Sequence, residues 1–296
     1  TRSMGPRMAL TVSGICEFIG AMFFSGMVLK SMSFMSLQPL MQTPSGIVEL
    51  RYIVLISLGI SLLFNFITWY LGLPSSSTHA LLGAMAGAAL CTQVGKAFLL
   101  SIIGKFFVVI FLSAVAGTIL GALASSLLQN LDIPYGPGKR LVDSANAVSG
   151  AFLSVLHGAN DAPKSLGLFL LATGSGTLAV ERGLYALIFS AVISMGVLFG
   201  ENRILRTLGF KLFRLRALDG LGANLAGVTT LGVCTAAGFP VSSTQALVSS
   251  VMGAAAAKNF KAVRWMVAVE IIASWCITLP VCAGAGYVLA KLLLPS

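Results

Sequence analysis

Charged side chains are scarce in this 296-residue sequence, where Asp, Glu, Lys and Arg together make up only 9%. A soluble globular domain contains about 25% charged residues, because polar groups must cover much of the surface that faces water. Hydrophobic residues instead make up 57% of the chain. This composition excludes an ordinary soluble domain and favours a protein that has lipid as its solvent.

The few charges that are present sum to +10. A nucleic-acid-binding protein gathers its basic residues into a patch or stripe. Here they flank apolar runs instead, as they do in the cytoplasmic loops of membrane proteins. We therefore expect a lipid bilayer around the protein and no nucleic-acid partner.

Cysteine and histidine are rare too, at five and two residues. The cysteines lie in apolar segments and form no Cys-x-x-Cys pair or Cys/His metal cluster, so we interpret them as packing residues: Cys16, Cys91, Cys234, Cys276 and Cys282. His79 and His157 belong to no H-E-x-x-H motif, and no G-x-S-x-G motif occurs. A membrane-embedded hydrolase is thus disfavoured, and we expect a protein that is not an enzyme and uses no cofactor.

Long apolar runs are what the sequence has in abundance. Leu10–Leu29 contains one charged residue, Glu17, while Tyr52–Leu73 and Phe106–Leu131 contain none. Each run is long enough to cross about 30 Å of hydrocarbon as a helix. The runs are continuous rather than alternating, which argues against a membrane β-barrel. The sequence predicts an all-α integral membrane protein with several spans.

The apolar runs and the turn signals between them define the expected elements. We expect helices over residues 9–30, 51–72, 76–94, 97–129, 144–173, 184–200, 218–237, 241–257 and 262–293, and a short amphipathic surface helix over 203–217. Pro163 and Pro280 are expected to make their helices irregular or broken. The turn-rich residues 131–140 are expected to link a first half, 1–130, to a second half, 141–296.

An internal repeat supports this division. Pro74–Leu81 and Pro240–Leu247 both read P-x-S-S-T-x-A-L, at an offset of 166 residues. Small residues spaced four apart follow each copy, at Gly83/Gly87 and Ser249/Gly253. Such agreement within otherwise dissimilar apolar sequence indicates duplication.

The flanking charges predict how the two copies are oriented. The run Leu10–Leu29 comes after Arg2 and Arg7, whereas its counterpart Leu184–Phe199 comes before a basic stretch that starts at Arg203. Basic residues mark the cytoplasmic end of a span. The two halves are therefore expected to be inverted-topology repeats, whose broken half-helices meet near the membrane midplane.

Each repeated motif has the chemistry of an anion site. A glycine and a proline break the incoming helix, and the serines and threonine follow where the first N–H groups of a new helix are unpaired. These N–H groups, the positive end of the helix dipole and the hydroxyls together favour an anion. The candidate ligands are Ser76, Ser77, Thr78, Ser242, Ser243 and Thr244. The alternative is that these hydroxyls only cap the helices.

A second polar cluster interrupts the apolar run 147–173. It reads H-G-A-N-D-A-P-K-S-L-G from His157 to Gly167, and helical spacing places Asn160 and Asp161 within reach of Lys164. A carboxylate at membrane depth is a candidate functional group. Asn160 and Asp161 offer hard oxygen ligands for Na⁺ or an acceptor for H⁺, although a self-neutralising Asp161–Lys164 pair is the alternative.

Three further polar residues are weaker candidates. Glu17 lies in the middle of an apolar run, where it could bind a proton or a cation or could join a polar helix interface. His79 follows the first hydroxyl cluster, and Gln245 takes its place in the second copy. A required proton carrier at His79 would not be symmetric between the two halves.

The G-A-N-D motif at Gly158–Asp161 and the two P-x-S-S-T segments together resemble the signatures of the inorganic phosphate transporter (PiT) family. The resemblance extends over essentially the whole chain. It implies an inverted-repeat fold, a homodimer in the cell membrane, and uptake of inorganic phosphate coupled to Na⁺ or H⁺. It also implies that Asn160 and Asp161 serve the cation and the substrate, and that the six hydroxyls contact phosphate.

The sequence departs from the family pattern at three points. The family carries a second G-A-N-D motif in its first half, which we expect to lie shortly before Thr1 together with a first helix. Pro163 and Gln245 stand where relatives often have glutamine and histidine. The large hydrophilic loop of some eukaryotic members is absent, which fits a prokaryotic-type protein.

Two other transport functions fit the same residues. Hydroxyls and helix ends can also bind another tetrahedral oxyanion such as sulfate, but phosphate at neutral pH still carries protons and needs an acceptor, which Asp161 or Asn160 supplies. A passive anion channel would need no buried carboxylate beside its anion site. Phosphate symport therefore remains the preferred hypothesis.

Overall fold

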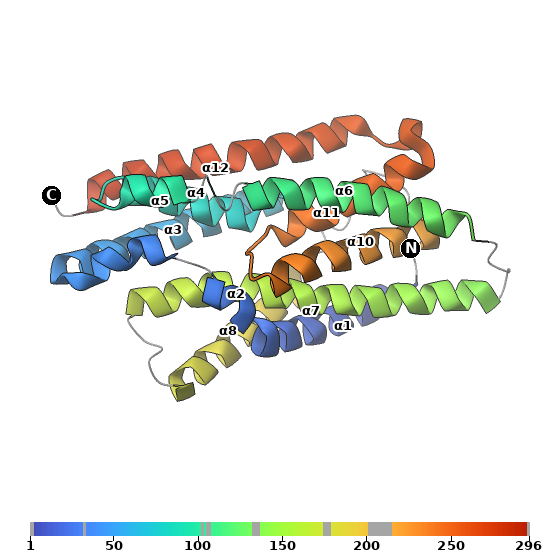
Figure 1. Cartoon of the computed structure of the whole chain (residues 1–296), viewed down its shortest axis with the longest axis horizontal. Coiled ribbons are helices and arrows are strands. Elements are labelled where there is room, and N and C mark those ends of the chain that lie inside the picture. Colours follow the sequence, from blue (N-terminus) through green and yellow to red (C-terminus); the bar gives the residue numbers. More distant parts are fainter. Residues whose placement is uncertain are drawn as a thin grey trace.

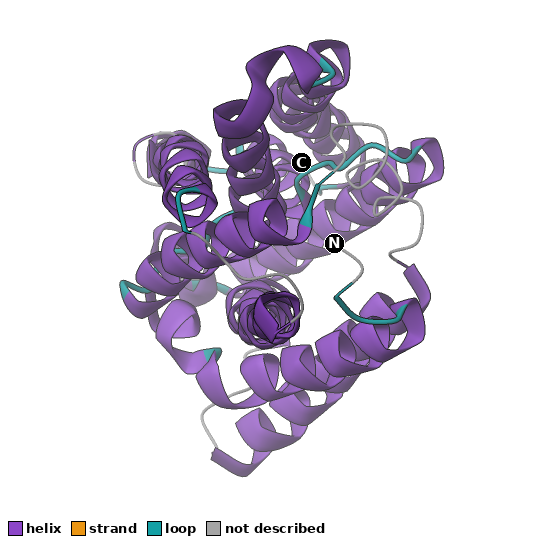
Figure 2. Ribbon diagram, turned by 90° about the vertical axis from the view of Figure 1, so that its right-hand side faces the viewer, coloured by secondary structure: helices purple, strands orange, loops and turns teal. Residues whose placement is uncertain are grey.

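The computed structural model of the chain describes residues 3–31, 34–101, 104, 108–131, 137–173, 179–200 and 215–294. These residues form helices, and none of them lies in a strand (Figures 1 and 2). Among them, four helical segments are long and apolar enough to cross a membrane: Pro6–Phe24, Pro44–Leu71, Val108–Gln129 and Trp265–Leu293. The chain is an all-α integral membrane protein, as predicted.

Most of the helices run roughly along the long axis of the molecule and pack side by side as a bundle (Figure 1). In chain order they are α1 (Pro6–Ile19), a π-helical turn (Gly20–Phe24), α2 (Gly26–Ser31), a 3-10 segment (Phe34–Gln42), α3 (Pro44–Leu71), α4 (Ser77–Ala89), α5 (Gly95–Ser101), α6 (Val108–Gln129), α7 (Pro137–Thr173), α8 (Ala179–Gly200), α10 (Ala217–Ala236), α11 (Ser243–Asn259), a 3-10 turn (Phe260–Ala262) and α12 (Trp265–Leu293). Viewed from one end in Figure 2, some helices are seen end-on and others run across them.

The helix boundaries differ from the prediction where proline starts a helix. α3 begins at Pro44 and α7 at Pro137, seven residues earlier than expected in each case. Proline has no N–H to lose in a first turn and its φ suits a helix, and Thr43 caps α3 by accepting a hydrogen bond from Gly46 N at 3.1 Å. The predicted linker 131–140 is therefore shorter, because its last residues belong to α7.

Proline does not interrupt helices where a break was expected. α7 continues through Pro163 and α12 through Pro280, so the expected break at Pro280 is wrong, while the local irregularity expected at Pro163 stays a prediction. Membrane helices tolerate proline because neighbouring groups satisfy the freed carbonyls. Within the helix expected over 97–129, the described residues form α5 and α6, and 102–103 and 105–107 lie outside the described residues. The amphipathic helix expected over 203–217 falls almost wholly outside them too.

Two short helices, α4 and α11, lie inside the bundle, where α4 packs along α12 and α11 packs along α6 (Figure 1). Glycines permit the close approach: a Cβ on Gly87 would overlap the Ala283 carbonyl oxygen, and one on Gly253 would overlap that of Thr118. This is the small-xxx-small packing typical of membrane helices. It fixes both half-helices against a long partner helix.

Candidate functional site

Both P-x-S-S-T segments have the local structure that their sequence predicts. Gly72 ends α3 with φ 71°, and Gly238 follows α10 with φ 77°. A side chain is disfavoured at such a φ, so glycine suits both breaks. Ser76 then caps α4, where its Oγ accepts from His79 N at 3.2 Å, and Ser242 caps α11 in the same way. New helices therefore start at both motifs.

The six candidate hydroxyls divide into different roles. Ser76 and Ser242 are buried caps, which is the capping role that the sequence left open as the alternative. The Thr78 hydroxyl donates to the Val241 carbonyl at 3.4 Å and so joins one motif to the other. Ser77 is exposed in a cavity, while Ser243 is buried against the polar cluster of α7. Thr244 is half-buried.

Asn160 holds the break before α11 in place. It is fully buried; its Nδ2 donates to the Phe239 carbonyl at 3.2 Å, and its Oδ1 accepts from Val241 N at 3.2 Å. Both ends of the amide are therefore engaged by the chain between Gly238 and Ser242. In this arrangement Asn160 shapes the second motif, and its role as a phosphate or cation ligand stays a prediction.

Asp161 is the centre of a polar cluster. Its carboxylate receives Lys164 Nζ at 2.6 Å, His157 Nε2 at 3.0 Å and Ser243 Oγ at 3.0 and 3.1 Å. Lys164 Nζ also donates to the Val241 carbonyl at 2.7 Å. A buried charge is stable only when it is paired and hydrogen-bonded, and the cluster meets that condition for both Asp161 and Lys164.

Glu17 joins this cluster from α1. His157 Nδ1 lies 2.7 Å from Glu17 Oε1, so the imidazole bridges Glu17 and Asp161. The two helices are in contact because Gly158 has no side chain; a Cβ there would overlap the Glu17 carbonyl oxygen. Glu17 is 3% exposed, and its carboxylate is therefore committed to the site rather than to lipid or water.

These groups line one cavity of 570 Å³ between α1, α3, α4, α7 and α8. Its polar lining comprises Glu17, Ser61, Asn65, Ser77, His157, Asp161, Lys164 and Ser165. Both ring nitrogens of His157 face carboxylate oxygens, and both can donate only when the imidazole is protonated, so an imidazolium and one ammonium balance the two carboxylates of this lining. The cavity thus combines the Ser77 hydroxyl at the start of α4 with two cationic and two anionic side chains, a set suited to an anion that arrives with a cation.

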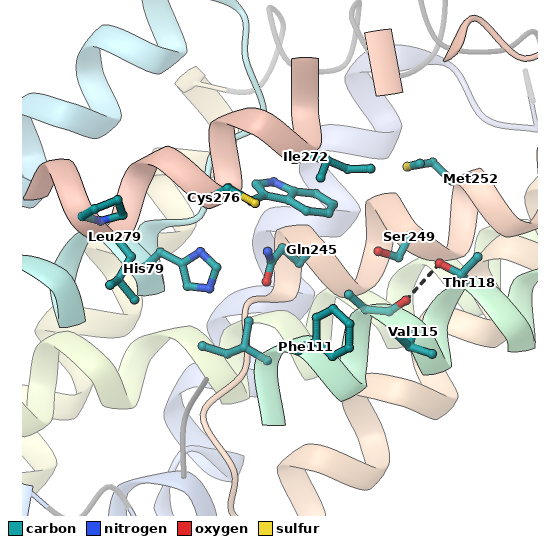
Figure 3. A pocket seen from close by; sticks show the side chains of 14 residues that line it. His79, Phe111, Val115, Thr118, Gln245, Ser249, Met252, Ile272, Cys276 and Leu279 are labelled. Carbon is teal, nitrogen blue, oxygen red and sulfur yellow. Dashed lines mark hydrogen bonds between the residues drawn. The ribbon is translucent and has the colours of Figure 1, made fainter. Parts of the chain in front are cut away.

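His79 and Gln245 are not part of this cavity. Residues 77 and 79 lie about 200° apart around a helix, so His79 faces away from the side of α4 on which Ser77 lies. His79 and Gln245 both line a second cavity of 390 Å³ between α4, α6, α11 and α12 (Figure 3). Their expected contact with the anion site is absent from the described arrangement.

Comparison with known proteins decides the family. A profile of the phosphate transporter family matches residues 1–140 and 136–286, which together are almost the whole chain. The chain belongs to the phosphate transporter family. It is 29% identical to the "Probable low-affinity inorganic phosphate transporter" of Bacillus subtilis, over 97% of this chain and 86% of that protein. A protein of the same name from Rhizobium meliloti is 31% identical over 96% of this chain and 84% of its own length.

A solved structure shares the fold of this phosphate transporter family member. That structure, named "The sodium-dependent phosphate transporter", superimposes with a TM-score of 0.76 over 99% of this chain and 91% of that chain. The sequences are 20% identical, so the likeness establishes the fold. Among the residues that the structure describes, no group of three or more His, Cys, Asp or Glu side chains could hold a metal ion.

His157 is the one residue of the polar cluster that the sequence did not predict as part of the site. His157 was considered only as a metal ligand, whereas it connects Glu17 to Asp161. Its spacing of four residues from Asp161 places both on one helix face and was a usable signal. The pairing with Glu17 had no such signal, because the two residues come from helices far apart in the chain.

Proposed function

We propose that this protein is a secondary transporter that carries inorganic phosphate across the cell membrane together with a cation, Na⁺ or H⁺. The observation that carries the proposal is the cavity lined by Ser77, at the start of α4, together with the half-buried Asp161 and its ion-pair partner, the buried Lys164. The names of the relatives support phosphate as the substrate, and the name of the structural neighbour supports cation coupling.

The anion would bind at the start of α4. Ser77 supplies a hydroxyl, the first turn of α4 supplies unpaired N–H groups and the positive end of the dipole, and Lys164, which lines the same cavity from α7, supplies a positive charge. Phosphate retains a proton near neutral pH, and the Asp161 carboxylate, which lines the cavity, would accept a hydrogen bond from it. An anion without protons has no use for such an acceptor, which favours phosphate over sulfate.

A coupling cation fits the site because phosphate would add negative charge to a cavity lining whose own charges are balanced. Adding phosphate to Glu17 and Asp161 without a cation would place several like charges in a low-dielectric site. Lys164 Nζ lies 2.6 Å from Asp161 Oδ1, in the position where a coupling cation would contact the carboxylate. We propose that Na⁺ or H⁺ at Asp161 displaces Lys164, which is then free to face phosphate.

The movement that carries the substrate would be alternating access by two inverted repeats, 1–130 and 141–296. Their correspondence is supported by the parallel breaks at Gly72 and Gly238, and by the crosswise packing of α4 on α12 and α11 on α6. Trp275 Nε1 of α12 also donates to the Pro74 carbonyl just before α4 at 2.9 Å. The short helix α4 of the first half therefore packs on α12 of the second half, and α11 of the second half packs on α6 of the first. A homodimer in the plasma membrane is part of the same proposal.

Radiolabelled phosphate uptake into proteoliposomes tests the function directly. The protein is studied with an inward Na⁺ gradient, an inward H⁺ gradient, or neither. We expect one gradient to drive accumulation above equilibrium, which identifies the coupling ion. Uptake that needs no gradient would indicate a passive anion channel, and equal competition by sulfate would indicate a general oxyanion permease; either result would overturn phosphate symport.

Ser77→Ala is expected to raise the KM for phosphate about 10- to 100-fold with little change in folding, because it removes one hydrogen bond to a charged ligand. Ser77 is exposed in the cavity, so no buried partner is left unpaired. Ser126→Ala on α6 makes the same chemical change at another exposed position and should leave the KM unchanged. Equal KM values for both variants would remove Ser77 from the phosphate site.

A further inference from the structure

The second cavity has a mostly apolar lining, unlike the first, which is lined by the charged side chains of Glu17, Asp161 and Lys164 and is called the ion-lined cavity below. It measures 390 Å³, within the range of small-ligand pockets, and it lies between α4, α6, α11 and α12. Most of its walls are apolar, with Phe111, Val115 and Ile272 among the lining residues (Figure 3). The transport mechanism proposed above makes no use of it.

Two buried polar side chains, His79 and Gln245, line this cavity and have polar atoms without a hydrogen-bond partner. Neither ring nitrogen of His79 is hydrogen-bonded, and the same holds for Gln245 Oε1; the Trp275 carbonyl lies near the His79 ring but outside hydrogen-bond geometry. His79 is 4% exposed and Gln245 is 5% exposed. Figure 3 shows the imidazole and the amide directed toward one another. Unsatisfied buried groups of this kind are rare and destabilising, and a bound polar group would satisfy them.

The cavity opens between α6 and α12 toward the surroundings of the bundle. Phe111 is 63% exposed, Ile272 is 43% exposed and Cys276 is also exposed. These residues belong to the two membrane-spanning segments Val108–Gln129 and Trp265–Leu293. A ligand would therefore enter from the lipid phase, and its outer part must be apolar.

We propose that this cavity is a binding site for a single-chain carboxylic acid that enters from the bilayer, such as a free fatty acid. The neutral carboxyl group would donate its O–H to Gln245 Oε1 and accept a hydrogen bond from His79. Both residues lie in the first turns of α4 and α11, whose dipoles favour the oxygen-rich head group. The hydrocarbon chain would lie against Phe111 and Ile272 and leave between α6 and α12.

The native Trp275 reports on this site because it lines the cavity. Trp69→Phe and Trp265→Phe leave it as the single tryptophan of the chain. The protein is placed in phosphatidylcholine nanodiscs and titrated with a terminally brominated dodecanoic acid, whose bromine quenches indole fluorescence on contact. We expect saturable quenching by the acid, and about tenfold weaker binding of its methyl ester, which lacks the donor.

Two variants serve as controls in the same background. His79→Phe removes the polar partner and should weaken binding of the acid about tenfold, whereas Ala114→Phe, at a half-buried position of the wall, should fill the cavity and abolish saturation. Quenching that rises in proportion to the probe, equally for acid, ester and Ala114→Phe, would mean ordinary partition into the bilayer and overturn the proposal. Quenching that appears only when oligomers dissociate would mean that a second copy covers the cavity, which would overturn it as well. The comparison of acid and ester needs no variant of the pocket, and neither readout depends on phosphate transport.

Discussion

Replacing Asp161 with asparagine is expected to reduce gradient-driven phosphate uptake by about 100-fold or more, to the level of empty liposomes. The carboxylate balances the charge of Lys164, which is only 5% exposed, and holds Ser243 and His157. Loss of one partner of a buried ion pair leaves an uncompensated charge, and the proposed cation loses its ligand. Initial rates of uptake under the coupling gradient measure the effect.

Asp143→Asn is the matched control, because Asp143 lies on the same helix, outside the cavity, and accepts only from the Ser3 hydroxyl among the contacts described. It should retain uptake. The single variant Asp161→Asn leaves the Lys164 charge unpaired and is expected to be less stable than the parent. The double variant Asp161→Asn/Lys164→Met removes both charges, so it should recover stability but not uptake. Uptake by the single variant within about twofold of the parent would contradict a role for Asp161 in coupling.

Replacing Gly87 with alanine is expected to destabilise the fold by about 1–3 kcal/mol, which lowers the midpoint of thermal unfolding by several degrees. The added Cβ would overlap the carbonyl oxygen of Ala283 on α12, where a backbone must move to make room. Because α4 carries Ser77 into the ion-lined cavity, uptake should also fall. Thermal unfolding in detergent, followed by tryptophan fluorescence, measures the shift.

Gly59→Ala is the corresponding control on α3. A Cβ at Gly59 meets no atom within 4 Å, and alanine has the higher helix propensity. This variant should be as stable as the parent or slightly more stable. If both glycine variants unfold at the same temperature, close packing of α4 on α12 does not hold the half-helix in place.

The sequence by itself determined the environment and the local structure of this protein. The sequence has too few charged residues to cover a surface that faces water, and its continuous apolar runs are long enough to cross a bilayer. These two properties together require lipid around the protein. Glycine and proline before each P-x-S-S-T segment determine that one helix ends and another begins, because these residues act on the backbone directly. The spacing of Asp161 and Lys164 likewise brings the two together on one turn of α7.

Only the tertiary structure decided which of these residues share a site. Ser76, Ser77 and His79 are almost adjacent in the chain, but each residue turns about 100° around a helix, so one caps, one faces the ion-lined cavity and one faces the apolar cavity. Glu17 reaches His157 because Gly158 lets α1 and α7 touch. Contacts between distant segments depend on how whole helices pack, and no pattern within a single helix contains that information.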